Sequence, residues 1–155
     1  MLKYIAGLID GEGCFSLSCE MQRGKVKVTP FSSISMKKGS WSSIFIVTLE
    51  EHGVKTTTRN RKGQTEVKVK GWKQVKHLIA LLVNICLVKK PLMEKLLEYE
   101  PRKRKNRHMP LDLDELKRTA ELIDFVRAFN KGKNRPYKWT GKKFLAAYQQ
   151  TVSKT

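Results

Sequence analysis

Two stretches of alternating apolar and polar residues constrain the fold of this chain more than any other feature of its sequence. The first begins with FSLSCEM at residues 15–21, passes a turn at 22–24 and continues with the same period through residues 25–37. The second surrounds Lys62-Gly63. A period of two is typical of strands that bury one face. The sequence therefore predicts two β-hairpins, each with an apolar face and a basic, hydroxyl-rich face.

Helical periodicity surrounds the two hairpins. The predicted helices cover residues 2–10, 40–53, 72–87, 92–99, 113–130 and 140–152. Pro30 predicts an edge position or a bulge in the second strand, because proline has no N–H for the ladder. The order helix, hairpin, helix, hairpin, helices indicates an α+β fold with an antiparallel sheet. At 155 residues, the chain is the usual size of a single domain, and we assign residues 1–155 to one.

The charge of the chain points to a polyanion as its partner. Lysine and arginine total 32 against 14 acidic residues, which gives a net charge of +18. A membrane is not the expected partner, because the longest apolar stretch, residues 78–88, is about half of a bilayer span. Its N-terminal apolar run is too short for a secretory signal, and the three cysteines lack metal-ligand spacing. We therefore expect an intracellular protein with reduced thiols, in the cytoplasm, the nucleoid or an organellar matrix.

The first predicted helix ends on two carboxylates, Asp10 and Glu12, in the segment IAGLIDGEG. The C-terminus of a helix carries about half a negative charge, so acids there cost roughly 0.3 to 1 kcal/mol each. A bound cation reverses that sign. Glu12 and the last carbonyls of the helix are hard oxygen ligands, which suit Mg²⁺. On spacing alone, the two acids can equally be a solvated helix end.

The whole segment at residues 5–13 resembles the signature of the LAGLIDADG homing endonucleases. Residues 6–10 and the final Gly13 match outright, and Glu12 keeps the second acid of the signature. Glycine replaces the alanine of the signature at Gly11, and isoleucine replaces its leucine at Ile5. The resemblance covers residues 1–100 by motif and element order. It implies an αββαββα core with a curved antiparallel sheet, followed here by extra C-terminal helices.

The resemblance also implies a metal-dependent endonuclease that is built around two copies of the signature helix. The helices would meet at a dimer interface formed by Ala6, Gly7, Asp10 and Gly11. Glu12 would be the catalytic acid and a ligand of Mg²⁺, or of another divalent cation such as Mn²⁺, together with the Gly11 carbonyl. Asp10 would have a structural hydrogen-bonding role.

Further site residues follow from the same resemblance. The family places a lysine near its active centre at the start of the helix after the core, where this chain offers Lys89 and Lys90 and the register does not decide between them. A polar residue at the end of the second strand helps to position water, and Lys37 or Lys38 occupies that region.

The single copy of the signature predicts a homodimer, and a two-fold dimer predicts a near-palindromic duplex DNA target. The only echo of the signature is AELIDFVRAF at residues 120–129, which lacks the flanking glycines and reads as an amphipathic core helix. Lysine and arginine on the sheet can reach guanine O6 and N7, while serine and glutamate can reach other base edges. The predicted DNA-binding residues of the two hairpins are Ser16, Ser18, Glu20, Lys25, Lys27, Ser33, Lys37, Lys55, Arg59, Arg61, Lys68 and Lys70. Phosphate contacts are expected from Lys103, Arg104, Lys105 and Lys133.

Two other functions use the same fold within the family. One is an RNA-binding maturase that assists intron splicing, and the other is a DNA-binding regulator that does not cleave. Loss of the acid at Glu12 would favour the regulator, and the acid is present. A preference for structured intron RNA over duplex DNA would favour the maturase.

Overall fold

The computed structural model describes residues 1–22, 25–101, 111–130 and 138–152. Its helices are α1 (Leu2–Glu12), α2 (Ser40–Glu51), α3 (Trp72–Leu82), α4 (Lys90–Glu98), α5 (Leu113–Phe129) and α6 (Gly141–Val152). Its strands are β1 (Cys14–Gln22), β2 (Lys25–Lys37), β3 (Thr57–Arg61) and β4 (Gln64–Lys70). The predicted order of helices and hairpins is confirmed, including the helical assignment of α2.

The described strands form one antiparallel sheet in the order β1-β2-β4-β3. Both predicted hairpins are present, and β2 joins them by pairing with β4. The turn of the second hairpin places Lys62 and Gly63 at φ of 41° and 80°. Glycine adopts that region readily, and its position there fits the tight turn between two twisted strands.

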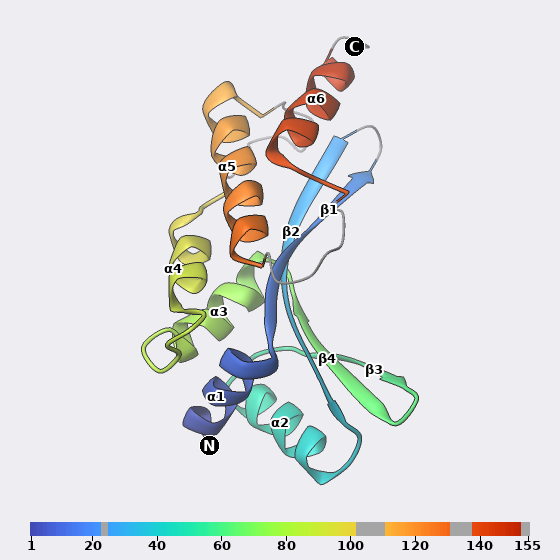
Figure 1. The fold of residues 1–155 in the computed structure, drawn as a ribbon, viewed down its shortest axis with the longest axis vertical. Helices are drawn as coiled ribbons and strands as arrows, with labels where there is room; N and C mark the ends of the chain where they lie inside the picture. Colours follow the sequence, from blue (N-terminus) through green and yellow to red (C-terminus); the bar gives the residue numbers. More distant parts are fainter. Residues whose placement is uncertain (23–24, 102–110, 131–137, 153–155) are drawn as a thin grey trace.

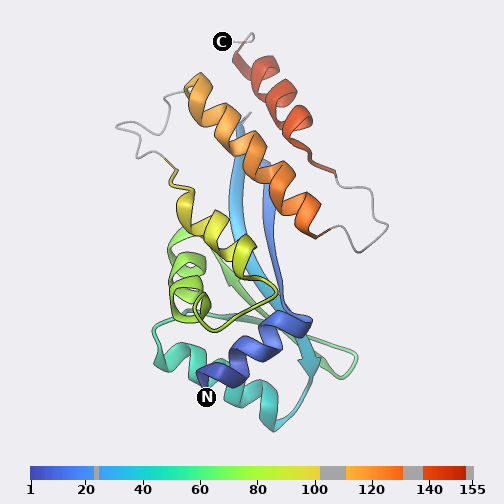
Figure 2. The ribbon, with the colours of Figure 1, turned by 60° about the vertical axis from the view of Figure 1, so that its left-hand side comes forward.

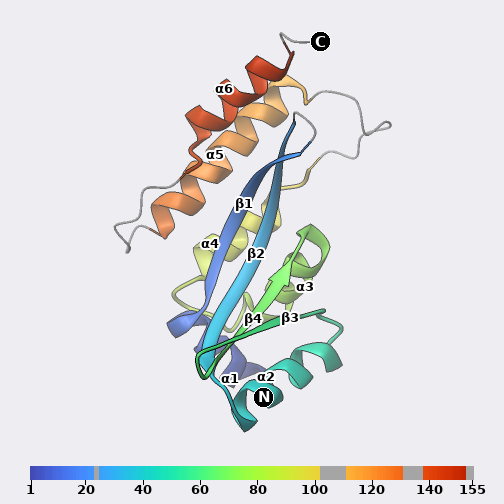
Figure 3. The same ribbon diagram turned by 90° about the vertical axis from the view of Figure 1, so that its right-hand side faces the viewer.

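The sheet is long and twisted, and helices α3, α4 and α5 lie along one of its sides (Figures 1 and 2). The opposite side of the middle of the sheet faces the viewer in Figure 3, with the strands in front of the helices. Helices α1 and α2 lie together near the end of the sheet where β3 and β4 diverge from β1 (Figure 1). None of the helices in the described part of the chain is long and apolar enough to cross a bilayer.

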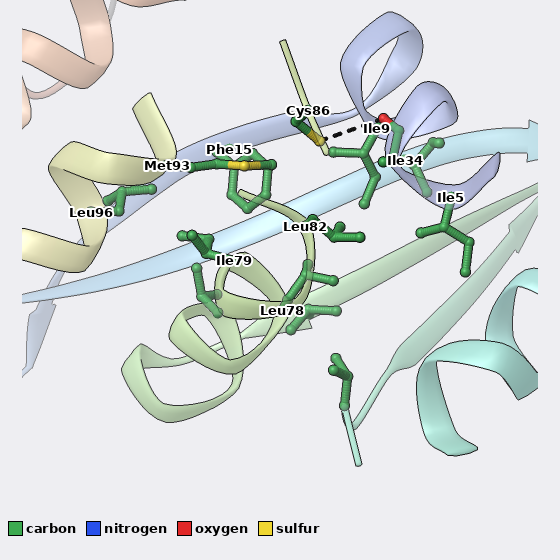
Figure 4. Close-up of a cluster of buried hydrophobic side chains, with 14 of the residues drawn as sticks. Ile5, Ile9, Phe15, Ile34, Leu78, Ile79, Leu82, Cys86, Met93 and Leu96 are labelled. Carbon is green, nitrogen blue, oxygen red and sulfur yellow. Dashed lines mark hydrogen bonds between the residues drawn. The ribbon is translucent and has the colours of Figure 1, made fainter. Parts of the chain in front are cut away.

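The core lies between the sheet and the helices that cover it. Ile5 and Ile9 of α1 point into a cluster that includes Leu78 and Leu82 of α3 (Figure 4). All four side chains are at most 2% exposed. Burying each of them contributes on the order of 1.5 to 3 kcal/mol, which fixes α1 against the sheet.

One local prediction is wrong, at the end of α3, and the prediction for Pro30 is confirmed in one of its two alternatives. Helix α3 ends at Leu82 rather than at residue 87. The backbone N–H groups of residues 87–89 donate to Asp10 of α1, so they cannot continue the helix. Residues 25–30 of β2 pair with β1 alone, so Pro30 lies at a local edge of β2, which is one of the two predicted alternatives, and the pairing around it has no bulge. The ladder with β4 ends there with Gly71 N–H donating to the Pro30 carbonyl at 2.9 Å.

Candidate nucleic-acid interface and metal centre

The strand register gathers most of the predicted DNA-binding residues on one face of the sheet. The opposite face points into the core and carries the buried Phe15, Val26, Ile34, Val67 and Val69. Alternate residues point the other way, and the pairings Ser18↔Thr29, Ser33↔Lys68 and Arg59↔Glu66 join them across all four strands. We call this the open face. Its predicted members are Ser16, Ser18, Glu20, Lys27, Ser33, Lys37, Arg59, Arg61, Lys68 and Lys70.

The remaining predicted contacts are at the end of a strand, outside the sheet or outside the described residues. Lys55 precedes β3, outside the sheet, and its N–H donates to the Gln74 side chain at 2.8 Å. Lys25 begins β2 opposite Gln22. The predicted phosphate contacts Lys103, Arg104, Lys105 and Lys133 lie outside the described residues.

The open face is basic but not uniformly so. Glu20 accepts a hydrogen bond from the Ser18 hydroxyl at 2.8 Å and lies 3.8 Å from the Lys70 ammonium. The hydrogen bond and the charge of Lys70 hold the pKa of Glu20 below its ordinary value. Glu20 is therefore a negatively charged hydrogen-bond acceptor among cations. A surface that only attracts phosphate would not need such an acceptor, whereas a surface that distinguishes base edges can use it.

Phe31 is a member of the open face that the sequence did not assign to DNA contact. It pairs with Ser16 of β1 and Lys70 of β4, in the middle of the sheet. The Lys68 ammonium lies 4.0 Å from the centroid of its ring. The signal was present in the sequence, because Phe31 breaks the alternation by placing an aromatic ring on the polar side of β2.

The C-terminal end of α1 presents Glu12 to solvent. Glu12 is exposed and has no hydrogen-bond or ion-pair partner among the described residues. The next residue, Gly13, is buried, and its N–H donates to the Ile9 carbonyl at 3.0 Å. A Cβ at Gly13 would lie 2.7 Å from that carbonyl oxygen, so the turn from α1 into β1 requires glycine. The last glycine of the signature therefore ends α1 directly after Glu12 and fixes the position of Glu12 at the helix terminus.

Asp10 fastens the loop after α3 to the end of α1. Its carboxylate accepts hydrogen bonds from the backbone N–H groups of Leu87 at 2.6 Å, Val88 at 3.2 Å and Lys89 at 2.9 Å. The Lys89 ammonium in turn donates to the Asp10 carbonyl at 2.9 Å. Lys90 instead faces Glu94 of its own helix at 4.0 Å. The structure thus brings Lys89, and not Lys90, to the helix end that carries Glu12.

The protonation of this loop contact follows from its geometry. Burial raises the pKa of Asp10, but the three N–H donors and the charge of Lys89 outweigh burial and hold the pKa below its ordinary value. The neighbouring Cys86 thiol is buried, and burial together with the Asp10 charge raises its pKa to about 11. Asp10 is therefore ionised and Cys86 is a protonated thiol near neutral pH. This agrees with a structural role for Asp10 and a chemically inert Cys86.

The donors at the end of α1 fit a hard divalent cation only as part of a larger set. The described residues hold no group of three histidine, cysteine, aspartate or glutamate side chains that could surround a metal. The Glu12 carboxylate and the last carbonyls of α1, including that of Gly11, are oxygen donors. Magnesium keeps several waters and takes one or two carboxylates plus phosphate oxygens. Glu12 and the Gly11 carbonyl would be the protein ligands in such a shell, with waters and phosphate oxygens as the others.

One side of α1 is open. Gly7 and Gly11 are exposed, and a Cβ at either position would meet nothing within 4 Å. Tyr4 lies on the same side and is 44% exposed, with its ring 5.5 Å from that of Trp41 of α2. Ala6 was predicted at the dimer interface but is 1% exposed and packs in the core of its own chain. Its carbonyl accepts a hydrogen bond from the Cys86 thiol at 3.6 Å (Figure 4).

Comparison with known proteins places the fold. No family model and no curated protein matches the sequence. Among solved structures, the homing endonuclease I-CvuI in complex with the I-CreI target superimposes with a TM-score of 0.71 at 17% identity, over 97% of this chain and 94% of that one. The archaeal intron-encoded homing endonuclease I-Vdi141I complexed with DNA gives a TM-score of 0.69 at 21% identity, over 98% and 96% of the two chains. The homing endonuclease I-TnaI gives 0.58 at 14% identity, over 97% of both chains.

These likenesses cover 97% to 98% of the chain, and so include α5 and α6, which lie beyond the part covered by the resemblance in sequence. They agree with the signature on α1 and with the order of helices and hairpins. The chain therefore has the fold of the LAGLIDADG homing endonucleases, as its signature segment predicts.

Proposed function

We propose that this protein is a site-specific DNA endonuclease that hydrolyses phosphodiester bonds on both strands of a near-palindromic duplex, with a divalent metal ion and as a homodimer. The observation that carries the proposal is the end of α1. There, the exposed Glu12 carboxylate, which has no partner among the residues that the structure describes, stands on the helix end that also holds the Lys89 ammonium.

The groups at this end of α1 support phosphodiester hydrolysis. Glu12 and the Gly11 carbonyl would hold Mg²⁺ or another divalent cation, which when bound activates water and stabilises charge on the scissile phosphate. The Lys89 ammonium, held 2.9 Å from the Asp10 carbonyl, is a cation available to the same phosphate. Asp10 keeps the Lys89 segment in place through three N–H contacts. The structure of I-CvuI with the I-CreI target was obtained in the presence of Mg, and a second complex of I-CvuI in the presence of Ca.

The open face supports duplex DNA as the substrate. It carries six of the basic residues assigned to DNA contact, together with hydroxyl groups and the acceptor Glu20. A two-stranded ribbon can enter the major groove, where such side chains distinguish all four base pairs. The net charge of +18 supplies a sequence-independent attraction to phosphate. Both I-CvuI and I-Vdi141I are described in complex with DNA.

The homodimer is supported by the open side of α1 and its surroundings. Small residues four apart, Gly7 and Gly11, let a second helix backbone approach closely. Trp41, Ile44 and Val47 of α2 are exposed large apolar side chains at helical spacing, and Trp41 adjoins Tyr4 of α1. Clustered apolar exposure of this kind marks an interaction site in a protein of this size. Association through α1 would bring two copies of Glu12 into one assembly, as cleavage of two strands requires.

Cleavage of a pooled, randomised duplex library with and without Mg²⁺ tests the proposal. Metal-dependent double-strand cuts at one near-palindromic sequence are the expected result. Binding to duplex DNA without cleavage, with several divalent metals tried, would support a DNA-binding regulator instead. Preference for structured intron RNA over duplex DNA, again without cleavage, would support a maturase. An intracellular location in the cytoplasm, nucleoid or an organellar matrix accompanies the proposal, because the substrate is cellular DNA.

A further inference from the structure

The open face contains one residue that does not match its surroundings. Phe31 is the only large apolar side chain among the described residues of that face. Its nearest neighbours across the strands are Ser16 and Lys70, and it belongs to neither of the buried hydrophobic clusters. Phe31 is half-buried. A phenylalanine in this position contributes less to the core than one on the opposite face, so packing alone does not explain it.

Lys68 places a cation against the ring of Phe31. Its ammonium lies 4.0 Å from the ring centroid, within the range of a cation–π contact. Lys68 and Phe31 lie on neighbouring strands, since Lys68 pairs with Ser33, two residues further along β2. The pair therefore offers an apolar ring and a cationic hydrogen-bond donor side by side, at the centre of the surface assigned to the major groove.

This combination matches a particular feature of DNA. The 5-methyl group of thymine is the apolar feature that a base pair presents in the major groove, and phenylalanine is one of the side chains that contact it. Guanine O6 and N7 are the acceptors that lysine reaches in the same groove. We propose that Phe31 is a specificity-determining residue that contacts a thymine methyl group in each half-site. This inference rests on the proposed function, because it requires duplex DNA on the open face.

Replacement of thymine by deoxyuridine tests the contact directly. Uracil keeps base pairing and every hydrogen-bonding group, and it lacks only the methyl group. In a duplex selected by the full-length wild-type protein, each thymine is replaced in turn, and affinity is measured by fluorescence anisotropy without added metal. We expect one position per half-site at which the replacement weakens wild-type binding about fourfold, which corresponds to the loss of one buried methyl group.

Three variants separate the contact from other effects. In Phe31→Ser, the sensitivity to deoxyuridine at that position should disappear, and the affinity for the thymine duplex should fall about fourfold. In Phe31→Leu, which keeps an apolar side chain but removes the ring, part of the sensitivity should remain. Phe129→Ser is the matched control, because Phe129 is an aromatic residue 36% exposed on α5. It should bind both duplexes as the wild type does.

The outcomes distinguish this inference from the function on which it rests. If the protein binds no duplex DNA, the proposed function fails and the inference fails with it. If the protein binds its duplex but no thymine position is sensitive, or the sensitivity persists in Phe31→Ser, only the role of Phe31 is overturned. A change in guanine preference in Phe31→Ser without any change in deoxyuridine sensitivity would show that Phe31 only positions Lys68, which also overturns the inference.

Discussion

The tripeptide Leu-Ile-Asp occurs twice in this chain, in α1 at residues 8–10 and in α5 at residues 122–124. The two copies make similar contacts within the fold. In both helices the isoleucine is buried. In both, the aspartate accepts backbone N–H groups from residues at or just before the start of a later helix. Asp10 accepts from residues 87–89, which immediately precede α4, and Asp124 accepts from the Gly141 N–H, the first of α6, at 2.9 Å. The Leu-Ile-Asp tripeptide at the centre of the signature therefore stabilises the packing of one helix against a later one.

What differs between the two helices is what surrounds the tripeptide. In α1, the glycines before and after it leave one side of the helix open, and Glu12 is exposed at the helix end. In α5, Phe125 follows the aspartate directly and the helix continues to Phe129. The proposed function of α1 therefore resides in its glycines and in Glu12, while Asp10 stabilises the fold.

The sharpest test of this difference is Glu12→Gln. The variant keeps the size of the side chain but removes its charge, so folding and DNA binding should be unchanged. The rate of metal-dependent cleavage should fall by about 100-fold or more, because a group at the reacting phosphate would be lost. Single-turnover cleavage of the selected duplex measures the effect. Glu121→Gln, which removes an exposed carboxylate from α5, is the control and should cleave at the wild-type rate. Equal rates for Glu12→Gln and the wild type would remove Glu12 from the mechanism.

The next largest effect is expected from Asp10→Asn. Its carboxylate accepts three backbone N–H groups, and an amide supplies one oxygen and puts its own donors among those N–H groups. The free energy of unfolding at neutral pH should fall by about 2 kcal/mol, the usual contribution of hydrogen bonds to a charged group. Asp124→Asn is the matched variant, and it should lose less, because an amide oxygen can still accept the single Gly141 N–H. Urea unfolding of both variants measures the difference.

The destabilisation by Asp10→Asn should depend on pH in a defined direction. The pKa of Asp10 is lower in the folded chain than its ordinary value of about 4. The carboxylate therefore stabilises the fold fully above that ordinary value, and this contribution is lost as the pH falls through the lower pKa of the folded state. The gap between the wild type and Asp10→Asn should shrink below about pH 4. A gap that stays constant down to pH 2 would show that ionisation of Asp10 does not contribute to stability.

The order and the type of most helices and strands could be predicted from the sequence, because they depend on local periodicity. The alternation of residues 15–21 predicted β1, and the Lys62-Gly63 turn predicted the second hairpin. What could not be predicted depends on contacts between distant residues. Helix α3 ends early, and Lys89 rather than Lys90 reaches α1, because Asp10 holds a segment 77 to 79 residues away.

The faces of α1 were also beyond the reach of the sequence. Every residue from Leu2 to Gly11 except Lys3 and Asp10 is apolar, aromatic or glycine, so periodicity does not say which side meets the core. For this reason Ala6 was expected beside Gly7 at an interface, whereas it is buried in its own chain. The role that we propose for Phe31 was not predicted for a related reason, since a single residue that breaks an alternation can mark an irregular strand as well as a site.

The open glycines of α1 give a smaller, more specific prediction. A Cβ at Gly7 meets nothing within 4 Å in a single chain, so Gly7→Leu should leave the fold intact. If a second copy packs on this side, the added side chain should weaken the homodimer about tenfold, roughly the cost of overpacking an interface. Sedimentation velocity over a concentration series measures it. Ala128→Leu, at an exposed small residue of α5, should not change the association, and an intact dimer in Gly7→Leu would place the interface elsewhere.

Gly141 of α6, which donates its N–H to Asp124 of α5, should respond to substitution in the opposite way: an added side chain should destabilise the fold and leave the association of chains unchanged. A Cβ at Gly141 would overlap Asp124 Oδ2 and lie 2.7 Å from the Ala120 carbonyl oxygen, both in the same chain. Gly141→Ala should therefore destabilise the fold by about 1 to 3 kcal/mol, because the Asp124 side chain can shift but the Ala120 carbonyl belongs to the backbone of α5. Urea unfolding measures this loss, while sedimentation should show no change in association. A stabilised Gly141→Ala would mean that α6 docks more loosely than the contact with Asp124 indicates. Opposite outcomes at Gly7 and Gly141 would show that glycine is required in α1 for contact with another molecule. In α6 it is required for packing within the same chain.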